Sequence, residues 1–217
     1  MTLTVAKALR NKLQLKASAN AQTIRVPMTR TKEDKNPGIV ERAQVSGTNG
    51  ADVFLSIHFN GSDHKKDVNI RGTEAWVYPH TKPPNGYGST YSVSGQINFD
   101  HDSNFARRVL NAALAVIPGG HEREPGVKEY LRTTDKQGRP YAKIPSDVYN
   151  DINLRNYRTS EPTGPNPSPS RAALIELEWI SNLDVDTWFN GASGTQNVGA
   201  LADSIADAIL LDIWTQP

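Results

Sequence analysis

Two residues suited to proton transfer or metal binding lie within apolar segments that are far apart in the sequence. His58 is near the end of residues 51–60, which read Ala-Asp-Val-Phe-Leu-Ser-Ile-His-Phe-Asn, and Glu176 follows the apolar residues 172–175. Such segments are typical of strands buried on both faces of a parallel sheet. Because ligands bind beyond the carboxyl ends of such strands, His58 is placed where a metal ligand or acid–base group is useful. A hydrogen-bonded structural histidine is the alternative interpretation.

A carboxylate at position 176 requires a specific environment. An unpaired charge in an apolar segment is costly, so Glu176 must be paired, bound to a metal or neutral. A salt bridge to an arginine is the structural interpretation, and general acid–base catalysis is the functional one. Glu178, two residues further along the same predicted strand, is expected to point the same way and competes for either role.

The composition excludes several classes of function. Among 217 residues, 24 Lys and Arg balance 23 Asp and Glu, and the resulting charge of +1 does not indicate nucleic acid binding. The absence of cysteine excludes disulfides, thiolate metal sites and cysteine nucleophiles, so a metal would need histidines and carboxylates. No apolar run is long enough to span a membrane, and no signal peptide follows Met1.

The predicted elements that position these residues alternate between helices and strands. Leu3, Leu9 and Leu13 recur at helical spacing, which predicts a helix from residue 2 to about residue 16. This alternation indicates an α/β fold: a single domain with a mostly parallel twisted sheet flanked by helices on both faces. Further strands are expected at 23–29, 51–60, 72–78 and 171–178. Further helices are expected at 39–48, 102–117, 184–189 and 198–209, the second of these capped by Asp102.

Two segments rich in proline, glycine and serine predict long loops. Residues 79–98 and 132–170 are expected to surround the mouth of a cleft with little regular structure. The second segment is interpreted as an insertion, at about 132–170, in a catalytic domain that spans residues 1–217.

Four motifs occur in an order that is similar to one enzyme family. They are Val-Pro-Met-Thr-Arg at 26–30, Glu-Arg-Ala-Gln-Val at 41–45, Ser-Ile-His-Phe-Asn at 56–60, and Ala-Ala-Leu-Ile-Glu at 172–176 followed by Ser-Asn at 181–182. Together they resemble the zinc-dependent N-acetylmuramoyl-L-alanine amidases that cleave peptidoglycan. The resemblance extends from about residue 3 to the predicted C-terminal helix.

The resemblance implies a role for each candidate residue. In that family His, Glu and His hold a zinc ion whose fourth position binds water. His58 matches the third ligand, Glu176 the general acid–base, and Asn60 and Arg71 are the candidate substrate-binding residues. The expected reaction is hydrolysis of the amide between the lactyl group of N-acetylmuramic acid and L-alanine by zinc-activated water.

The sequence also departs from the family pattern. The first ligand histidine, the ligand glutamate and the first strand have no counterpart, which leaves the zinc site incomplete and one flank of the sheet exposed. The missing ligands lie upstream, are replaced by other side chains, or are lost. Two other functions therefore stay open: a non-catalytic module that binds wall glycopeptide or a regulatory partner, and a metal-free glycosidase that pairs Glu176 with Glu178 or Asp100.

The resemblance further implies where the protein acts. Peptidoglycan is the expected partner, with no nucleic acid and no membrane span, and the protein is expected to be a monomer. It would work outside the cytoplasm, in the periplasm, in the cell wall or as a secreted autolysin, or it would be delivered by a phage as an endolysin.

Overall fold

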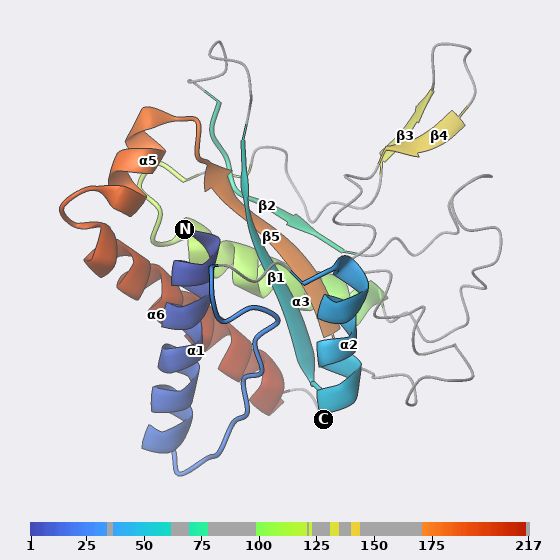
Figure 1. Ribbon diagram of the computed structural model, residues 1–217, viewed down its shortest axis with the longest axis vertical. Coiled ribbons are helices and arrows are strands. Elements are labelled where there is room, and N and C mark those ends of the chain that lie inside the picture. Colours follow the sequence, from blue (N-terminus) through green and yellow to red (C-terminus); the bar gives the residue numbers. More distant parts are fainter. Residues whose placement is uncertain are drawn as a thin grey trace.

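A mixed three-stranded sheet forms the centre of the computed structural model (Figure 1). The strands β1 (Val53–Asn60) and β2 (Glu74–Trp76) flank β5 (Arg171–Trp179). β1 runs parallel to β5, whereas β2 pairs with β5 in the antiparallel direction. The α/β class is confirmed. A mostly parallel sheet is not confirmed, because one described strand pair is parallel and the other is antiparallel. Sheets of α/β proteins often carry such an antiparallel strand at an edge. The structure describes residues 1–33, 37–61, 70–77, 99–120, 122, 131–134, 140–143 and 171–215.

Alternate residues of the strands give the sheet a core face and an opposite face. Ile57, Ala75 and Ile175 belong to the hydrophobic core. The helices α1 (Thr2–Ala19) and α3 (Phe99–Leu114) pack over this face, and α6 (Gly194–Thr215) packs against both of them (Figure 1). The remaining alternate positions, which include Ser56 and His58, therefore lie on the face that points away from this core.

The helices follow the predicted apolar spacing. α1 buries Leu3, Val5, Leu9, Leu13 and Ala17 and ends three residues beyond the predicted boundary. α3 buries the expected stripe of Phe105, Val109 and Ala113. The predicted cap at Asp102 is wrong, because α3 begins at residue 99 and the buried Oδ1 of Asp102 instead accepts a hydrogen bond of 2.7 Å from the backbone N–H of Ala172.

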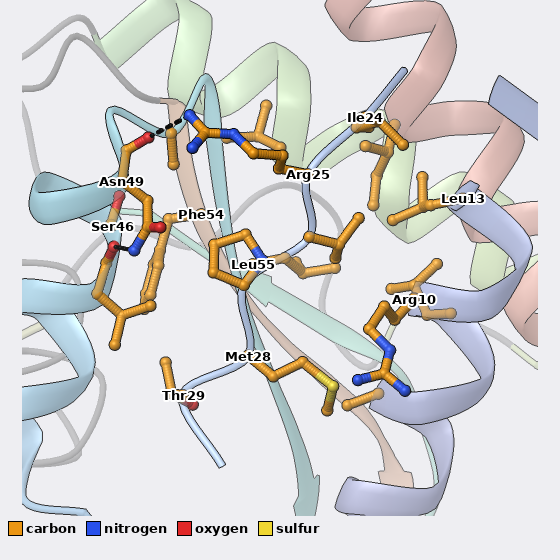
Figure 2. Close-up of a pocket in the computed structure, with 18 of the residues that line it drawn as sticks. Arg10, Leu13, Ile24, Arg25, Met28, Thr29, Ser46, Asn49, Phe54 and Leu55 are labelled. Atoms are coloured by element: carbon orange, nitrogen blue, oxygen red, sulfur yellow. Dashed lines mark hydrogen bonds between the residues drawn. The ribbon is translucent and has the colours of Figure 1, made fainter. Parts of the chain in front are cut away.

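Shorter elements complete the described part of the chain. α2 (Ile39–Asn49) lies beside Phe54 of β1, on the face opposite the core, so helices flank both faces as predicted (Figure 2). α5 (Leu183–Asn190) begins after Asn182, whose side chain accepts hydrogen bonds from the backbone N–H groups of Asp184 and Val185 at 3.0 and 3.2 Å. None of the helices in the described ranges is long and apolar enough to cross a membrane.

The structure describes only part of the two segments that were predicted as loops. β3 (Leu131–Thr134) and β4 (Pro140–Lys143) form an antiparallel two-stranded sheet of their own. The expectation of little regular structure is therefore wrong at the start of the 132–170 segment, where a short hairpin forms. Residues 144–170 and 79–98 lie outside the described residues, and the insertion itself stays a prediction.

Residues 22–30 are not a strand, contrary to the prediction for residues 23–29. A strand requires a neighbour that supplies ladder hydrogen bonds, and the described residues place none beside this segment. Pro27 also lacks the N–H group that such a ladder would use. The segment instead lines a groove together with residues of β1.

Candidate active site

Polar side chains from three strands form one row across the sheet. His58 of β1 is the register partner of Glu176 of β5, and Glu176 is also the register partner of Glu74 of β2. Neighbouring strands lie about 4.8 Å apart, and register partners point to the same face. An imidazole and two carboxylates are therefore neighbours on the sheet face that points away from the core.

The row lies close to the carboxyl ends of two parallel strands. His58 is two residues before the end of β1, and Glu176 is three residues before the end of β5. This is the edge at which open α/β sheets bind ligands. The register places His58 and Glu176 side by side on one face of the sheet, whereas their chemical roles stay predictions.

A local irregularity shapes the end of β1. The register changes between the pair His58–Glu176 and the pair Asn60–Trp179, so β5 contains one more residue than β1 over this interval. Such bulges occur beside active sites, where they change the direction of a side chain. The Nδ2 atom of Asn60 is buried and has no hydrogen-bond acceptor among the described residues. Since buried amide donors are normally satisfied, this amide is a candidate donor to a substrate carbonyl.

Ser56 orients the imidazole of His58. The two residues lie on the same face of β1, and Nε2 of His58 is 3.1 Å from Oγ of Ser56. A hydroxyl can either donate to or accept from a ring nitrogen, so this contact fits both neutral tautomers. A metal ion or substrate group at Nε2 would have to replace Ser56.

Glu178 has a structural environment that distinguishes it from Glu176. Its side chain is fully buried; Oε1 is 3.2 Å from Nη2 of Arg71, and Oε2 accepts hydrogen bonds from the N–H groups of Gly72 at 2.8 Å and Trp179 at 3.3 Å. These contacts satisfy both carboxylate oxygens and compensate the buried charge. Glu178 is therefore a poor candidate for the acid or base of a glycosidase.

Arg71 is held by the same contacts. Its Nη2 atom also donates a hydrogen bond of 2.9 Å to the carbonyl of Pro118, so the guanidinium joins the segment before β2 to β5 and to the turn after α3. The structure thus shows a structural role for Arg71. Its predicted role in substrate binding stays a prediction.

Glu74 was missed by sequence reasoning. The alternating, aromatic-rich pattern of residues 72–78 predicts a strand, but it does not single out the carboxylate of Glu74. Glu74 is only 5% exposed, and a buried carboxylate within a strand is the signal that could have drawn attention to it. Its place beside Glu176 depends on strand register, which no local pattern in the sequence encodes.

The described residues do not form a complete zinc site. Catalytic zinc sites use three protein ligands, and no group of three His, Asp or Glu side chains in the described part of the chain could hold a metal ion. His101 lies exposed on α3, whereas His64, His80 and His121 lie outside the described residues. His58 and its described neighbours therefore do not fit a catalytic zinc ion by themselves.

Comparisons with known proteins relate both sequence and fold to one group of enzymes. A family model described as N-acetylmuramoyl-L-alanine amidase matches residues 1–210. The N-acetylmuramoyl-L-alanine amidase of Clostridium difficile 630 is 18% identical, with a TM-score of 0.63 over 99% of this chain and 83% of that one. No curated protein sequence matches the chain.

Two further solved structures share the fold. The amidase Ami1 of Mycobacterium smegmatis is 16% identical, with a TM-score of 0.57 over 97% of this chain and 76% of that one. The catalytic domain of CwlV, an amidase of Paenibacillus polymyxa, is 17% identical, with a TM-score of 0.54 over 96% of this chain and 83% of that one. At these identities the likeness concerns the fold, and the match of the family model carries the family.

Proposed function

Because the chain belongs to the N-acetylmuramoyl-L-alanine amidase family, we propose that it hydrolyses the amide between the lactyl group of N-acetylmuramic acid and L-alanine in peptidoglycan. The observation that supports this proposal is the row of His58, Glu176 and Glu74 near the carboxyl ends of β1 and β5. Its substrate implies that the protein acts outside the cytoplasm, on the cell wall.

We assign Glu176 as the general base and acid. Its carboxylate accepts a proton from the attacking water, the water oxygen bonds to the lactyl carbonyl carbon, and the same proton then passes to the departing amine of L-alanine as the C–N bond breaks. Glu176 suits this role better than Glu74 because Glu176 is partly exposed whereas Glu74 is almost fully buried.

Asn60 is assigned to substrate binding. Its buried Nδ2 donor, which lacks an acceptor among the described residues, can donate a hydrogen bond to a carbonyl of the stem peptide or the lactyl group. A fixed amide donor stabilises negative charge that develops on such an oxygen during attack by water.

Zinc is the cofactor that the family resemblance implies, and His58 is the residue assigned to bind it. When bound, such an ion lowers the pKa of its water and polarises the carbonyl. The described residues lack the three ligands that a catalytic zinc ion requires, so the roles above concern the side chains alone. Further ligands would have to come from outside the described residues.

The incomplete ligand set favours one alternative function, a module that binds wall glycopeptide or a regulatory partner without cleaving it. To test both functions, purified peptidoglycan is incubated with the chain at high concentration, and new L-alanine amino termini and new reducing sugar ends are measured separately. Release of L-alanine amino termini supports the amidase. Sedimentation with peptidoglycan without release supports the binding module, and new reducing ends would contradict both.

A further inference from the structure

The fold explains only one residue of the Ser-Asn motif at 181–182. Asn182 caps α5, because its side-chain oxygen accepts hydrogen bonds from the backbone N–H groups of Asp184 and Val185. The Oγ atom of Ser181 is buried and has no hydrogen-bond partner among the described residues. Since buried hydroxyls are normally satisfied, Ser181 indicates a partner that these residues do not supply.

Ser181 lies in the turn that follows β5. The backbone N–H of Asn182 donates a hydrogen bond of 3.0 Å to the carbonyl of Trp179, which closes a β-turn around Ser181. The turn is joined to β1, because the N–H of Ile180 donates a hydrogen bond of 2.9 Å to the carbonyl of Asn60. Ser181 therefore has a fixed place beside the carboxyl end of β1.

A second unsatisfied polar atom lies at the same place. The Nδ2 atom of Asn60, assigned above to substrate binding, is also buried without an acceptor in the described ranges. Asn60 ends β1, and its carbonyl is bound to the residue that precedes Ser181. Two unsatisfied groups on adjoining segments, at the edge where α/β sheets bind ligands, favour a common ligand over two separate defects of packing.

The turn is both accessible and rigidly supported. Leu183, two residues after Ser181, is 73% exposed, so the described residues leave the start of α5 open. Ser181 as a whole is partly exposed, and rotation about χ1 can direct its hydroxyl toward a ligand. Behind the turn, the ring of Phe189 on α5 packs edge-to-face on Phe59 of β1, with ring centroids 4.8 Å apart (Figure 1).

The position of the turn indicates which part of a substrate it contacts. Asn60 is two residues beyond His58 in β1, a distance of about 7 Å along a strand. An extended peptide advances about 3.3–3.6 Å per residue, so a group bound here is roughly two residues from a bond cleaved beside His58. A hydroxyl can donate and accept, which matches the C=O and N–H of a secondary amide.

We propose that Ser181, next to Asn60, binds a secondary amide of the substrate that is not the amide being cleaved. This inference rests on the proposed function, because the amide belongs to peptidoglycan. Two groups close to the cleaved bond have this chemistry: the peptide bond that follows L-alanine and the acetamido group of the amino sugar. Ser181 is thereby a specificity residue, which selects substrates that carry this amide.

The test measures binding of three soluble ligands to the 217-residue chain by NMR titration. The parent ligand is an N-acetylmuramoyl dipeptide. In the first analogue a trans-alkene replaces the peptide bond after L-alanine, and in the second an n-propyl group replaces the acetamido group. Each analogue keeps the approximate shape and loses the C=O and N–H of one amide. A chelator prevents metal-dependent cleavage during the titration.

Ser181→Ala should bind the parent ligand about three- to tenfold more weakly than the wild type, the usual effect of one neutral hydrogen bond. For one of the two analogues, the wild type and Ser181→Ala should have the same affinity, because the partner of the hydroxyl is already absent. That analogue identifies which of the two amides Ser181 binds.

Ser204→Ala is the matched control. The Oγ atom of Ser204 on α6 donates a hydrogen bond of 2.9 Å to the carbonyl of Ala112 on α3. Ser204→Ala should lower the urea midpoint and leave ligand affinity unchanged, because it removes a hydrogen bond of the fold. Ser181→Ala should do the reverse, because it leaves no group of the described chain unpaired.

Three results would overturn the inference while the proposed function stands. These are equal affinity of the wild type and Ser181→Ala for the parent ligand, the same loss of affinity for all three ligands, and a urea midpoint lowered as much as by Ser204→Ala. The last result would mean that the chain itself satisfies the hydroxyl. A wild-type chain that neither binds the parent ligand nor releases L-alanine amino termini would overturn the proposed function, and this inference with it.

Discussion

Glu176 and Glu178 are two residues apart on β5 and have different environments. Glu178 is fully buried and satisfied by Arg71 and two backbone N–H groups. Glu176 is partly exposed and lies in register with His58 and Glu74. One carboxylate therefore stabilises the fold, and the other is available for chemistry.

Replacement of Glu176 by Gln tests the assignment of the general base. Glu176→Gln keeps the size of the side chain but cannot accept a proton, so the rate should fall by about 10²–10⁴-fold. Release of L-alanine amino termini from peptidoglycan measures this rate. Glu41→Gln, a change at an exposed carboxylate on α2, is the matched control and should retain activity. Equal activity of the two variants would exclude Glu176 as the base.

Replacement of Glu178 should affect stability. Glu178→Ala leaves the guanidinium of Arg71 and two N–H groups without their acceptor, and breaking a buried ion pair costs about 3–5 kcal/mol. Urea denaturation measures the free energy of unfolding. A loss below about 1 kcal/mol would show that solvent replaces these contacts easily.

Asp212 connects three elements at the opposite end of the sheet. Its buried carboxylate is 2.6 Å from Nε of Arg171 at the start of β5 and 3.5 Å from Nε of Arg108 on α3. Because Asp212 belongs to α6, this ion cluster joins α3, α6 and β5. The cluster explains how a carboxylate is tolerated near the end of an apolar helix.

Asp212→Ala should lower the free energy of unfolding by about 3–5 kcal/mol, since it leaves two arginines without their buried partner. Asp207→Ala is the control, because Asp207 is 65% exposed and its ion pair with Lys16 is a surface pair worth about 1 kcal/mol or less. Thermal or urea unfolding compares the two variants. Equal losses would contradict a special role for Asp212.

The contact between α1 and α6 predicts a small dependence of stability on pH. Hydrogen bonds from Lys12 and then Lys16 lower the pKa of Asp203 below its ordinary value of 3.8. A lowered pKa in the folded state stabilises the protein above pH 3.8, and this stabilisation is lost as the pH falls through the folded-state pKa.

Asp203→Asn should therefore be less stable than the wild type near neutral pH by at most about 1 kcal/mol, because Asp203 is 41% exposed and screened by solvent. The difference should decrease below pH 3.8 and in high salt. Unfolding measured from about pH 2 to about pH 7, the range that includes the titration of carboxylates, checks this prediction. A stability difference between the variant and the wild type that grows at low pH would contradict the lowered pKa of Asp203 in the folded state.

For the whole molecule, the groove beside β1 and the incomplete ligand set concern the same region, because the groove lining reaches His58. The resemblance implies two further zinc ligands, a His and a Glu, that have no counterpart in this sequence.

We therefore predict that the 217-residue chain binds zinc weakly and cleaves peptidoglycan slowly. Fusion of an N-terminal segment with an apolar strand, a His and a Glu should increase both zinc affinity and rate, because zinc affinity depends on several ligands held together. Metal analysis and cleavage with and without chelator test this. Stoichiometric zinc and chelator-sensitive cleavage by the unextended chain would mean that residues outside the described ones supply the missing ligands.

Local patterns in the sequence determined most elements and the main candidate residues. Apolar spacing predicted α1, α3 and α6, because the side of a helix that packs on a core is encoded within a few turns. The apolar composition of residues 51–60 and 171–178 predicted two buried strands, which the structure shows at 53–60 and 171–179. His58 and Glu176 were identified as polar residues within these strands. The four motifs then predicted the family.

Only the tertiary structure decided how these parts meet. The row of His58, Glu176 and Glu74, the pairing of Arg71 with Glu178 and the antiparallel direction of β2 all depend on strand register between distant segments. The same is true of residues 22–30, which have the composition of a strand but lack a described neighbour. Local sequence encodes burial and periodicity, whereas pairing requires a partner whose position is set by the packing of the whole domain.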